Sequence, residues 1–153
     1  MPEIKETVEH DNSIVQAYDG DLYSESVRQH IFNVSKRWLD PNGDGNPEDG
    51  VDGFRFDLAV SLARNEQGFD ANSALLDAIA REPRLRGVKL IAEPWDVGPE
   101  GYRLGAFPAP WSEWNDRYRD CVRRFWRGDA GVLPELATRI HGSSDLFDQP
   151  LRG

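Results

Sequence analysis

The sequence has little of several things that mark common classes of protein. It holds one cysteine, Cys121, in 153 residues, so no internal disulfide can form and a reducing, cytoplasmic compartment is expected. No apolar run approaches the roughly 18 residues needed to span a bilayer, and no apolar signal core follows Met1. We therefore expect no membrane partner. The histidines show no metal-ligand spacing: His10, His30 and His141.

Positive charge is also scarce. Lys and Arg number 18 against 27 Asp and Glu, which gives a net charge of −9 and a pI near 4.8. Nucleic-acid grooves and anionic membranes attract clustered Lys and Arg, so neither is an expected partner. An acidic surface is indifferent to neutral ligands such as sugars. Full disorder is not expected, because 5 Trp, 7 Phe and 4 Tyr supply large core groups.

The spacing of apolar residues predicts an α/β order of elements. Residues 1–23 are polar and aperiodic and form a lead-in, and residues 24–153 form the domain. Val27, Ile31 and Val34 lie on one face of a helix that begins after Ser24 and stops before Pro41. Further helices are expected from residue 72 or 73 to about 80, over 117–127 and over 133–140, and strands are expected over 51–59 and 88–93. This alternation implies parallel strands with helical crossovers.

The loop after the first helix begins like a calcium-binding loop. Asp40, Asn42 and Asp44 alternate and are followed by Gly45. The match breaks at the twelfth position, where Val51 stands in place of Glu. A solvated helix-to-strand turn is therefore the preferred interpretation, with calcium at the three alternating residues as the alternative.

The first strand contains the charged motif Asp52-Gly53-Phe54-Arg55-Phe56-Asp57. Arg55 and Asp57 are two residues apart in a strand and so face the same side. A single buried charge is expensive, so we expect the pair to share one environment and to offset each other. A neighbouring Arg also favours the ionised, nucleophilic carboxylate. A structural ion pair at a strand end is the alternative.

The second strand ends in Glu93-Pro94-Trp95-Asp96. Glu93 lies at the carboxyl end, where parallel α/β folds place active sites, although a helix cap is an equally simple role. If the two strands are neighbours they lie about 4.8 Å apart, which brings Asp57 and Glu93 near the roughly 5–5.5 Å of a retaining glycosidase. An ionised Asp57 would be the nucleophile and a protonated Glu93 in an apolar pocket the general acid.

The stretch after these motifs is rich in aromatic residues. Phe107, Trp111, Trp114 and Tyr118 either line a carbohydrate cleft or pack in the core, and Asn115 and Asp116 between them could bond sugar hydroxyls. Cys121 falls on the apolar face of its helix and is expected to be a buried, inert thiol.

At these residues the sequence resembles the α-amylase family of glycoside hydrolases. The Asp52–Asp57 and Ala92–Asp96 motifs resemble those at the fourth and fifth strands of the family's (β/α)₈ barrel, with one helix between them. The resemblance implies that Asp57 is the nucleophile, Arg55 its positioning partner and Glu93 the general acid/base. The fold it implies is a partial TIM barrel, about half of the catalytic (β/α)₈ domain.

The run Trp111-Ser112-Glu113-Trp114-Asn115-Asp116 looks like the isoamylase and glycogen-debranching branch, which cuts α-1,6 bonds in glycogen or limit dextrins. This branch implies an α-glucan substrate and no organic cofactor. The residues taken to contact that substrate are Trp95, Asp96, Trp114 and Asn115. Residues 27–45, in contrast, look more like neopullulanases and cyclomaltodextrinases.

Two motifs of the family have no counterpart here: the His-Asp pair of the seventh strand, which carries the third catalytic carboxylate, and the His motif of the third strand. At 153 residues the chain is roughly 100 short of a whole barrel, so we expect it to be inactive without the remainder of the barrel. The alternatives are a neopullulanase- or amylase-type α-1,4 hydrolase, a non-catalytic glucan-binding fragment, and a fragment that complements another chain.

Overall fold

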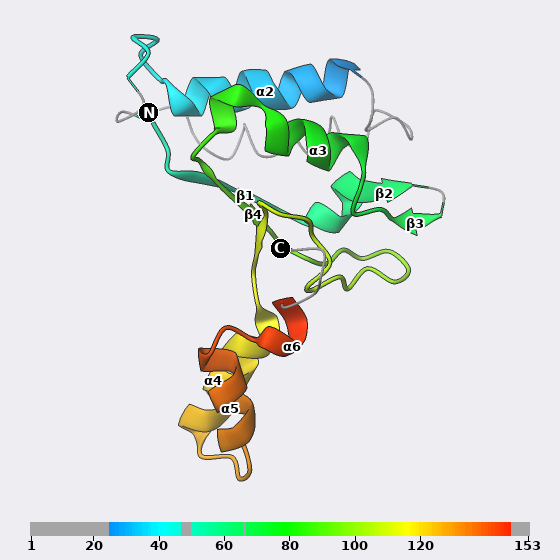
Figure 1. Ribbon diagram of the computed structural model, residues 1–153, viewed down its shortest axis with the longest axis vertical. Coiled ribbons are helices and arrows are strands. Elements are labelled where there is room, and N and C mark those ends of the chain that lie inside the picture. The colour runs from blue at the N-terminus through cyan, green and yellow to red at the C-terminus, as the bar shows by residue number, and fades with distance from the viewer. Residues whose placement is uncertain (1–24, 47–49, 66, 148–153) are drawn as a thin grey trace. The chain divides into compact units, whose positions relative to one another are not determined.

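The computed structural model describes residues 25–46, 50–65 and 67–147 (Figure 1). The chain divides into two compact units, residues 1–50 and residues 51–153, and each is described by itself. The predicted lead-in and the predicted cap at Ser24 lie outside the described residues. None of the helices in the described part of the chain has the length and apolarity to span a bilayer.

The first unit contains one described helix, α2 (Glu25–Leu39), as the apolar spacing predicts. Lys36 and Arg37 occupy its last turn, where positive charge interacts favourably with the carboxyl end of the helix dipole. The helix ends one residue before Asp40, whose N–H donates to the Lys36 carbonyl at 3.1 Å. The predicted stop before Pro41 is therefore confirmed.

The second unit is built on a parallel sheet in the order β1 (Gly53–Phe56), β4 (Lys89–Ala92) and β5 (Ser112–Glu113). In Figure 1, β1 and β4 run side by side, and their register pairs Phe54 with Leu90 and Phe56 with Ala92. The mixed α/β class with parallel strands is thus confirmed. At position 53 a Cβ would come within 2.8 Å of the Lys89 Cβ, so only glycine fits this close strand approach.

The first strand is shorter than the predicted range of 51–59. Leu58 adopts a left-handed conformation with φ of 44°, which ends the strand direction and starts the 3-10 helix η2 (Ala59–Ala63). A two-stranded antiparallel piece that the sequence did not predict follows, β2 (Arg64–Asn65) paired with β3 (Gly68–Phe69).

Helix α3 (Ala74–Arg81) lies in the crossover connection between β1 and β4, as predicted. Ser73 caps its amino end by accepting the Leu76 N–H at 3.2 Å. The 3-10 helix η3 (Pro83–Leu85) leads from it into β4. The apolar side of α3, together with η2 and β4, forms the core of this unit. The residues that are fully or nearly fully buried there include Val60, Leu75, Leu76, Ile79, Leu90 and Ala92.

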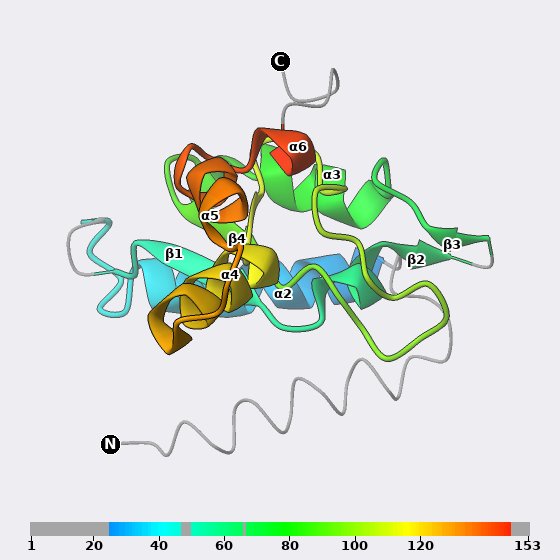
Figure 2. The same cartoon turned by 90° about the horizontal axis from the view of Figure 1, so that it is seen from below.

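Helices α4 (Asp116–Arg127) and α5 (Leu133–Ile140) pack against each other as a hairpin, and the short α6 (Ser144–Phe147) follows (Figures 1 and 2). Asn115 caps α4, and Gly128 ends it in a left-handed conformation with φ of 85°. Both long helices match their predicted ranges. Cys121 is buried and free, as predicted, whereas much of the remaining apolar surface of α4 is exposed.

Candidate active site

Three residues follow the three parallel strands directly and so share one edge of the sheet. They are Asp57 after β1, Glu93 after β4 and Trp114 after β5. The ladder continues through them, because Glu93 N–H donates to the Phe56 carbonyl and Trp114 N–H to the Ala92 carbonyl, both at 3.0 Å. This is the carboxyl edge, where parallel α/β sheets place ligands.

Arg55 joins these three residues. Its Nη2 lies 2.6 Å from Asp57 Oδ1 and 3.4 Å from Glu93 Oε1, and its Cζ lies 4.1 Å from the centre of the Trp114 ring. The two carboxylate oxygens can be no farther apart than the sum of those two distances from one nitrogen, about 6 Å. The sequence thus predicted correctly that Arg55 and Asp57 face the same side.

The environments of the two carboxylates differ. The Asp57 side chain is 62% exposed, and the Arg55 side chain is 34% exposed, so the pair does not share the buried environment that the sequence suggested. Strand β1 ends at Phe56, which leaves Asp57 beyond the pleat of the sheet. Glu93 in contrast is buried, with a side-chain exposure of 12%.

Glu93 does not lie in the wholly apolar pocket that its predicted role assumed. Its Oε2 accepts the N–H of Leu58 at 2.8 Å, and its Oε1 faces Arg55. The left-handed turn at Leu58 directs that N–H across to the neighbouring strand end. Such a turn at a non-glycine residue is uncommon, and it fixes the orientation of the Glu93 carboxylate.

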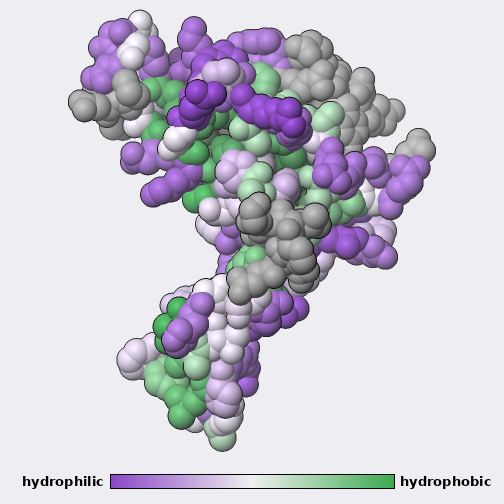
Figure 3. Space-filling model, in the orientation of Figure 1, coloured by the Kyte–Doolittle hydropathy of each residue, from purple (hydrophilic) through white to green (hydrophobic). Residues whose placement is uncertain are grey.

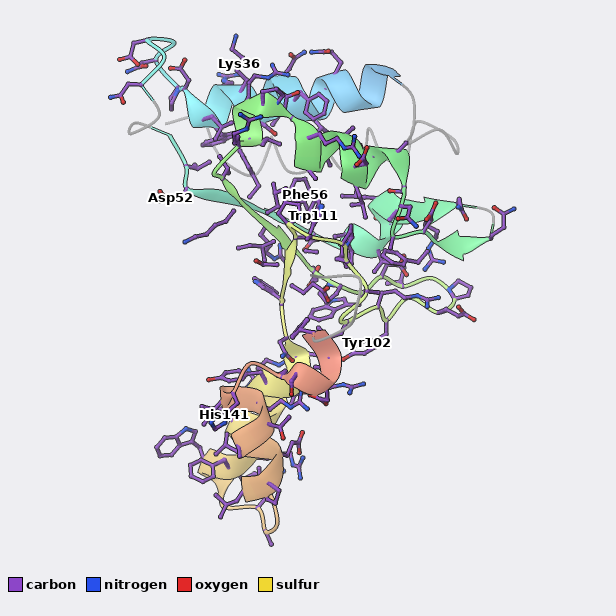
Figure 4. All side chains as sticks on the ribbon, in the orientation of Figure 1. Lys36, Asp52, Phe56, Tyr102, Trp111 and His141 are labelled. Carbon is purple, nitrogen blue, oxygen red and sulfur yellow. The ribbon has the colours of Figure 1, made fainter. Side chains whose placement is uncertain are left out.

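Aromatic side chains form the floor beneath this edge. The rings of Phe56 and Trp111 meet edge to face at 4.9 Å, and Figure 4 shows the two pointing toward each other. Phe107 packs 6.0 Å from Trp111 and 5.2 Å from Phe69. The predicted aromatic cluster therefore divides: Phe107 and Trp111 are core residues, whereas Trp114 and Tyr118 remain exposed.

Asp96, which the sequence predicted to contact substrate, makes hydrogen bonds to other residues of the chain. Its two oxygens accept from Arg64 Nε and Nη2 at 2.9 and 2.8 Å, and Oδ1 also accepts the Gly98 N–H. The hydrogen bond and charge of Asp96 raise the pKa of Arg64 above its usual value. These contacts favour a role in holding the loop after β4, and contact with substrate stays a prediction.

A pocket of about 310 Å³ lies at the end of β5 and the start of α4, and its walls include three of the four predicted substrate contacts, Trp95, Trp114 and Asn115. The other walls are Glu113, Asp116, Tyr118 and Arg119. Asn115 has structural partners, because it accepts the Tyr118 N–H and donates to Ser143 Oγ. The sequence missed Glu113, since a strand of two residues carries no periodic signal, and it missed Arg119, which lies in the predicted helix but on no recognisable motif.

The calcium alternative gains no support from the loop after α2. Gly45 N–H donates to Asp40 Oδ2, and Asp44 N–H donates to Asn42 Oδ1, both at 3.1 Å, so the loop is closed by bonds between its own side chains and backbone. Over the described ranges, no group of three or more His, Cys, Asp or Glu side chains is arranged to hold a metal ion. Calcium at this loop stays a prediction, as does the solvated turn.

Fold and site together define an α/β protein that presents two carboxylates and an arginine at the carboxyl edge of a parallel sheet. No family model matches the chain. It is 55% identical over 98 residues to a glycogen operon protein GlgX homolog of Mycobacterium tuberculosis, 42% identical over 126 residues to the Haemophilus influenzae homolog, and 56% identical over 99 residues to a glycogen debranching enzyme of Pectobacterium carotovorum.

The matches cover 64%, 82% and 65% of this chain but only 14%, 18% and 15% of those relatives. The chain therefore spans less than a fifth of their length. The resemblance to the glycogen-debranching type is confirmed, and with it, by resemblance, the class of a glycosidase. The likeness of residues 27–45 to neopullulanases stays a prediction.

Proposed function

We propose that this chain supplies part of the catalytic (β/α)₈ barrel of an α-glucan hydrolase that cuts α-1,6 branch points. One observation carries the proposal: a single guanidinium, that of Arg55, contacts carboxylates at the ends of two adjacent parallel strands. The names of the relatives, which include glycogen debranching enzyme, support the branch-point specificity. A single cysteine suits a cytoplasmic setting.

The proposed reaction retains configuration. Asp57 attacks the anomeric carbon while Glu93 gives a proton to the departing glycosidic oxygen, and water then hydrolyses the glycosyl-enzyme with Glu93 as the base. Asp57 Oδ1 and Glu93 Oε1 lie within about 6 Å of each other, which is compatible with the roughly 5–5.5 Å between the carboxyl groups of a retaining pair. Only a glycosyl group and protons move, so no organic cofactor is required.

Arg55 would orient both carboxylates, and their different exposures suit their different tasks. The exposed Asp57 can reach a sugar above the sheet edge. The buried Glu93 is held from two sides, by Leu58 N–H and by Arg55, so the orientation of its carboxyl group is fixed. The third catalytic carboxylate of the family has no predicted counterpart here, so the proposal includes the remainder of the barrel as a partner and little turnover by the chain alone.

The test replaces the aligned segment of the Haemophilus influenzae relative with this chain and measures reducing ends released from branched limit dextrin. Glu93→Gln should lower turnover by about 10²–10⁴-fold, and Asp57→Asn at least as much. Asp52→Asn is the matched control, because Asp52 precedes the same strand and is exposed (Figure 4). Undiminished turnover in Asp57→Asn would contradict the proposal.

The same hybrid separates the alternatives. Faster cleavage of linear maltodextrin than of limit dextrin would favour the α-1,4 hydrolase, and glucan binding without turnover would favour the binding fragment. With α-glucosyl fluoride and azide, Asp57→Ala should yield the β-azide and Glu93→Ala the α-azide, because azide takes the place of nucleophile in one and of water in the other. Turnover of limit dextrin by the isolated chain, abolished by Asp57→Asn, would overturn the predicted need for a partner.

A further inference from the structure

Arg64 and Asp96 form a largely buried ion pair with two parallel hydrogen bonds. Arg64 Nε and Nη2 donate to the two Asp96 carboxylate oxygens at 2.9 and 2.8 Å, and Arg64 Nη1 donates to the Pro99 carbonyl at 3.0 Å. The Asp96 side chain is 6% exposed and the Arg64 side chain 26%. Two parallel hydrogen bonds from one guanidinium fix the orientation of a carboxylate as well as its distance. The pair therefore fixes the start of the loop after β4.

The loop after β4 folds tightly around this pair. Gly98 N–H donates to Asp96 Oδ1 at 2.8 Å, and Asp96 N–H donates to the Gly101 carbonyl at 2.9 Å. A Cβ at position 98 would lie 3.0 Å from Arg64 Nη2, and one at position 101 would lie 2.3 Å from Asp96 Oδ1. Glycine at both positions permits this close approach of the backbone to the ion pair.

The segment from Leu58 to Arg64 contacts the end of β4 and the loop after it at two points. At its start, Leu58 N–H donates to Glu93 Oε2 at 2.8 Å, and Ala59 N–H donates to the Glu93 carbonyl at 3.0 Å. At its end, Arg64 binds Asp96. Glu93 and Asp96 are thus held by the two ends of the same short segment.

The connections between the two contact points are short and packed. The residues of η2 that have no exposed surface are Ala59, Val60 and Ala63. On the other side Pro94, which is fully buried, follows Glu93 directly, and its ring fixes φ. A displacement of Arg64 should therefore be passed along η2 to the Leu58 N–H that contacts Glu93.

We propose that Arg64 is a positioning residue for the general acid. Its two hydrogen bonds to Asp96 hold η2 where the Leu58 N–H meets the Glu93 carboxylate, so Arg64 acts on the orientation of Glu93 through Asp96 and η2. This inference rests on the proposed function for the role of Glu93.

The effect of a residue that positions the acid depends on the leaving group. In the hybrid with the Haemophilus influenzae relative, Arg64→Lys keeps the charge and loses the planar fork. Its kcat/KM for branched limit dextrin should fall by about tenfold to a hundredfold, because the departing sugar oxygen needs a proton from a correctly placed acid. Its kcat/KM for α-maltosyl fluoride should stay within about twofold, because fluoride leaves as the anion without a proton. Equal losses on the two substrates would mean a general structural role and would overturn the proposal.

Arg81→Lys is the matched control, because the same substitution then falls in an exposed ion pair of α3, that of Arg81 with Asp77. It should leave both rates unchanged. Asp96→Asn should reproduce the pattern of Arg64→Lys, and the double variant should be within about twofold of either single variant, since each breaks the same pair. Losses that add in the double variant would also overturn the proposal, because the two residues would then act separately.

Hydrogen exchange of the Leu58 amide, followed by NMR in the 153-residue chain, tests the same link without turnover. Arg64→Lys should speed this exchange by about tenfold or more, whereas Arg81→Lys should not. The Trp114 amide, which donates to the Ala92 carbonyl, should exchange at the parent rate in both variants. Rapid exchange of Leu58 in the parent, or no change in Arg64→Lys, would overturn the positioning role. An inactive parent hybrid would contradict the proposed function alone, because the exchange measurement does not depend on it.

Discussion

The sheet region and the helical hairpin of the second unit bury their apolar residues to very different extents. Around β1, β4 and α3 the large aliphatic side chains face inward, and Leu75, Leu76 and Ile79 have no exposed surface. In the α4–α5 hairpin many face outward: Trp126 is 80% exposed, Leu133 67% and Ile140 62%. Figure 3 shows this apolar surface over the hairpin. The two carboxylates of the candidate site, Asp57 and Glu93, therefore lie on the well-packed region.

Ion pairs link the helices of the hairpin to one another and to the turns between them. Arg124 Nη1 lies 2.8 Å from Glu135, which joins α4 to α5, and Arg127 pairs with Asp129 at the turn between them. Arg139, which is buried, lies 2.5 Å from Asp145 of α6. Apolar burial does not depend on pH as ion pairs do. The sheet region also carries ion pairs, such as Arg64–Asp96, but it has a buried apolar core beside them, so the two regions should respond to different extents to the same treatment.

The largest expected difference in unfolding free energy comes from substituting one leucine by alanine in each region. Leu76→Ala should cost about 2–5 kcal/mol of unfolding free energy, because the side chain is fully buried and leaves a cavity. Leu133→Ala, in the hairpin, should change it by no more than about 0.5 kcal/mol. Urea unfolding followed by circular dichroism measures both. Equal losses would show that the hairpin core is as important as the sheet core.

Acid should loosen the hairpin before the sheet region. Hydrogen bonds from Arg127, Arg139 and Arg119 hold the pKa values of their partners below the usual range, and these partners are Asp129, Asp145 and Asp120. A folded pKa below the unfolded value stabilises the fold above about pH 4, and this stability is lost as pH falls through the folded pKa. In the sheet region the hydrogen bond from Arg84 lowers the pKa of Glu82 in the same way.

Hydrogen exchange of backbone amides at pH 6 and pH 3, corrected for the intrinsic rate, measures this difference. Amides of α4 and α5 should lose more protection at pH 3 than amides of α3 and β4. Asp145→Asn should remove part of the pH dependence in the hairpin. Equal loss in both regions would contradict the assignment of the hairpin's stability to ion pairs.

The regions also differ in how far the sequence predicted them. The strands of the site could be placed because each is an apolar run that ends in a charged residue, and parallel pairing then brings Asp57 beside Glu93. The left-handed turn at Leu58 and the two-residue strand β5 could not be predicted, since neither carries a periodic pattern of apolar residues. Their consequences, the Leu58 N–H on Glu93 and the ring of Trp114 on Arg55, depend on contacts between distant parts of the chain.

Helix α4 shows that a sequence pattern can predict the range of a helix without predicting which of its residues are buried. The spacing of Tyr118, Cys121, Phe125 and Trp126 gave the helix its correct range, because periodicity records which residues share a face. Periodicity does not record what covers that face. In the described structure Cys121 is buried, and Tyr118, Phe125 and Trp126 are exposed.

The smallest expected effect on stability comes from replacing Trp126, the most exposed of the described tryptophans. Trp126→Phe should change the unfolding free energy by no more than about 0.5 kcal/mol, whereas Trp111→Phe, at a position only 3% exposed and packed on Phe56, should cost more. Acrylamide quenching gives the opposite order, since Trp126 is open to the quencher and Trp111 is not. Loss of quenching in Trp126→Phe should therefore exceed that in Trp111→Phe. The reverse order would mean that the apolar face of α4 is covered in solution, and the contrast between the hairpin and the sheet region would then disappear.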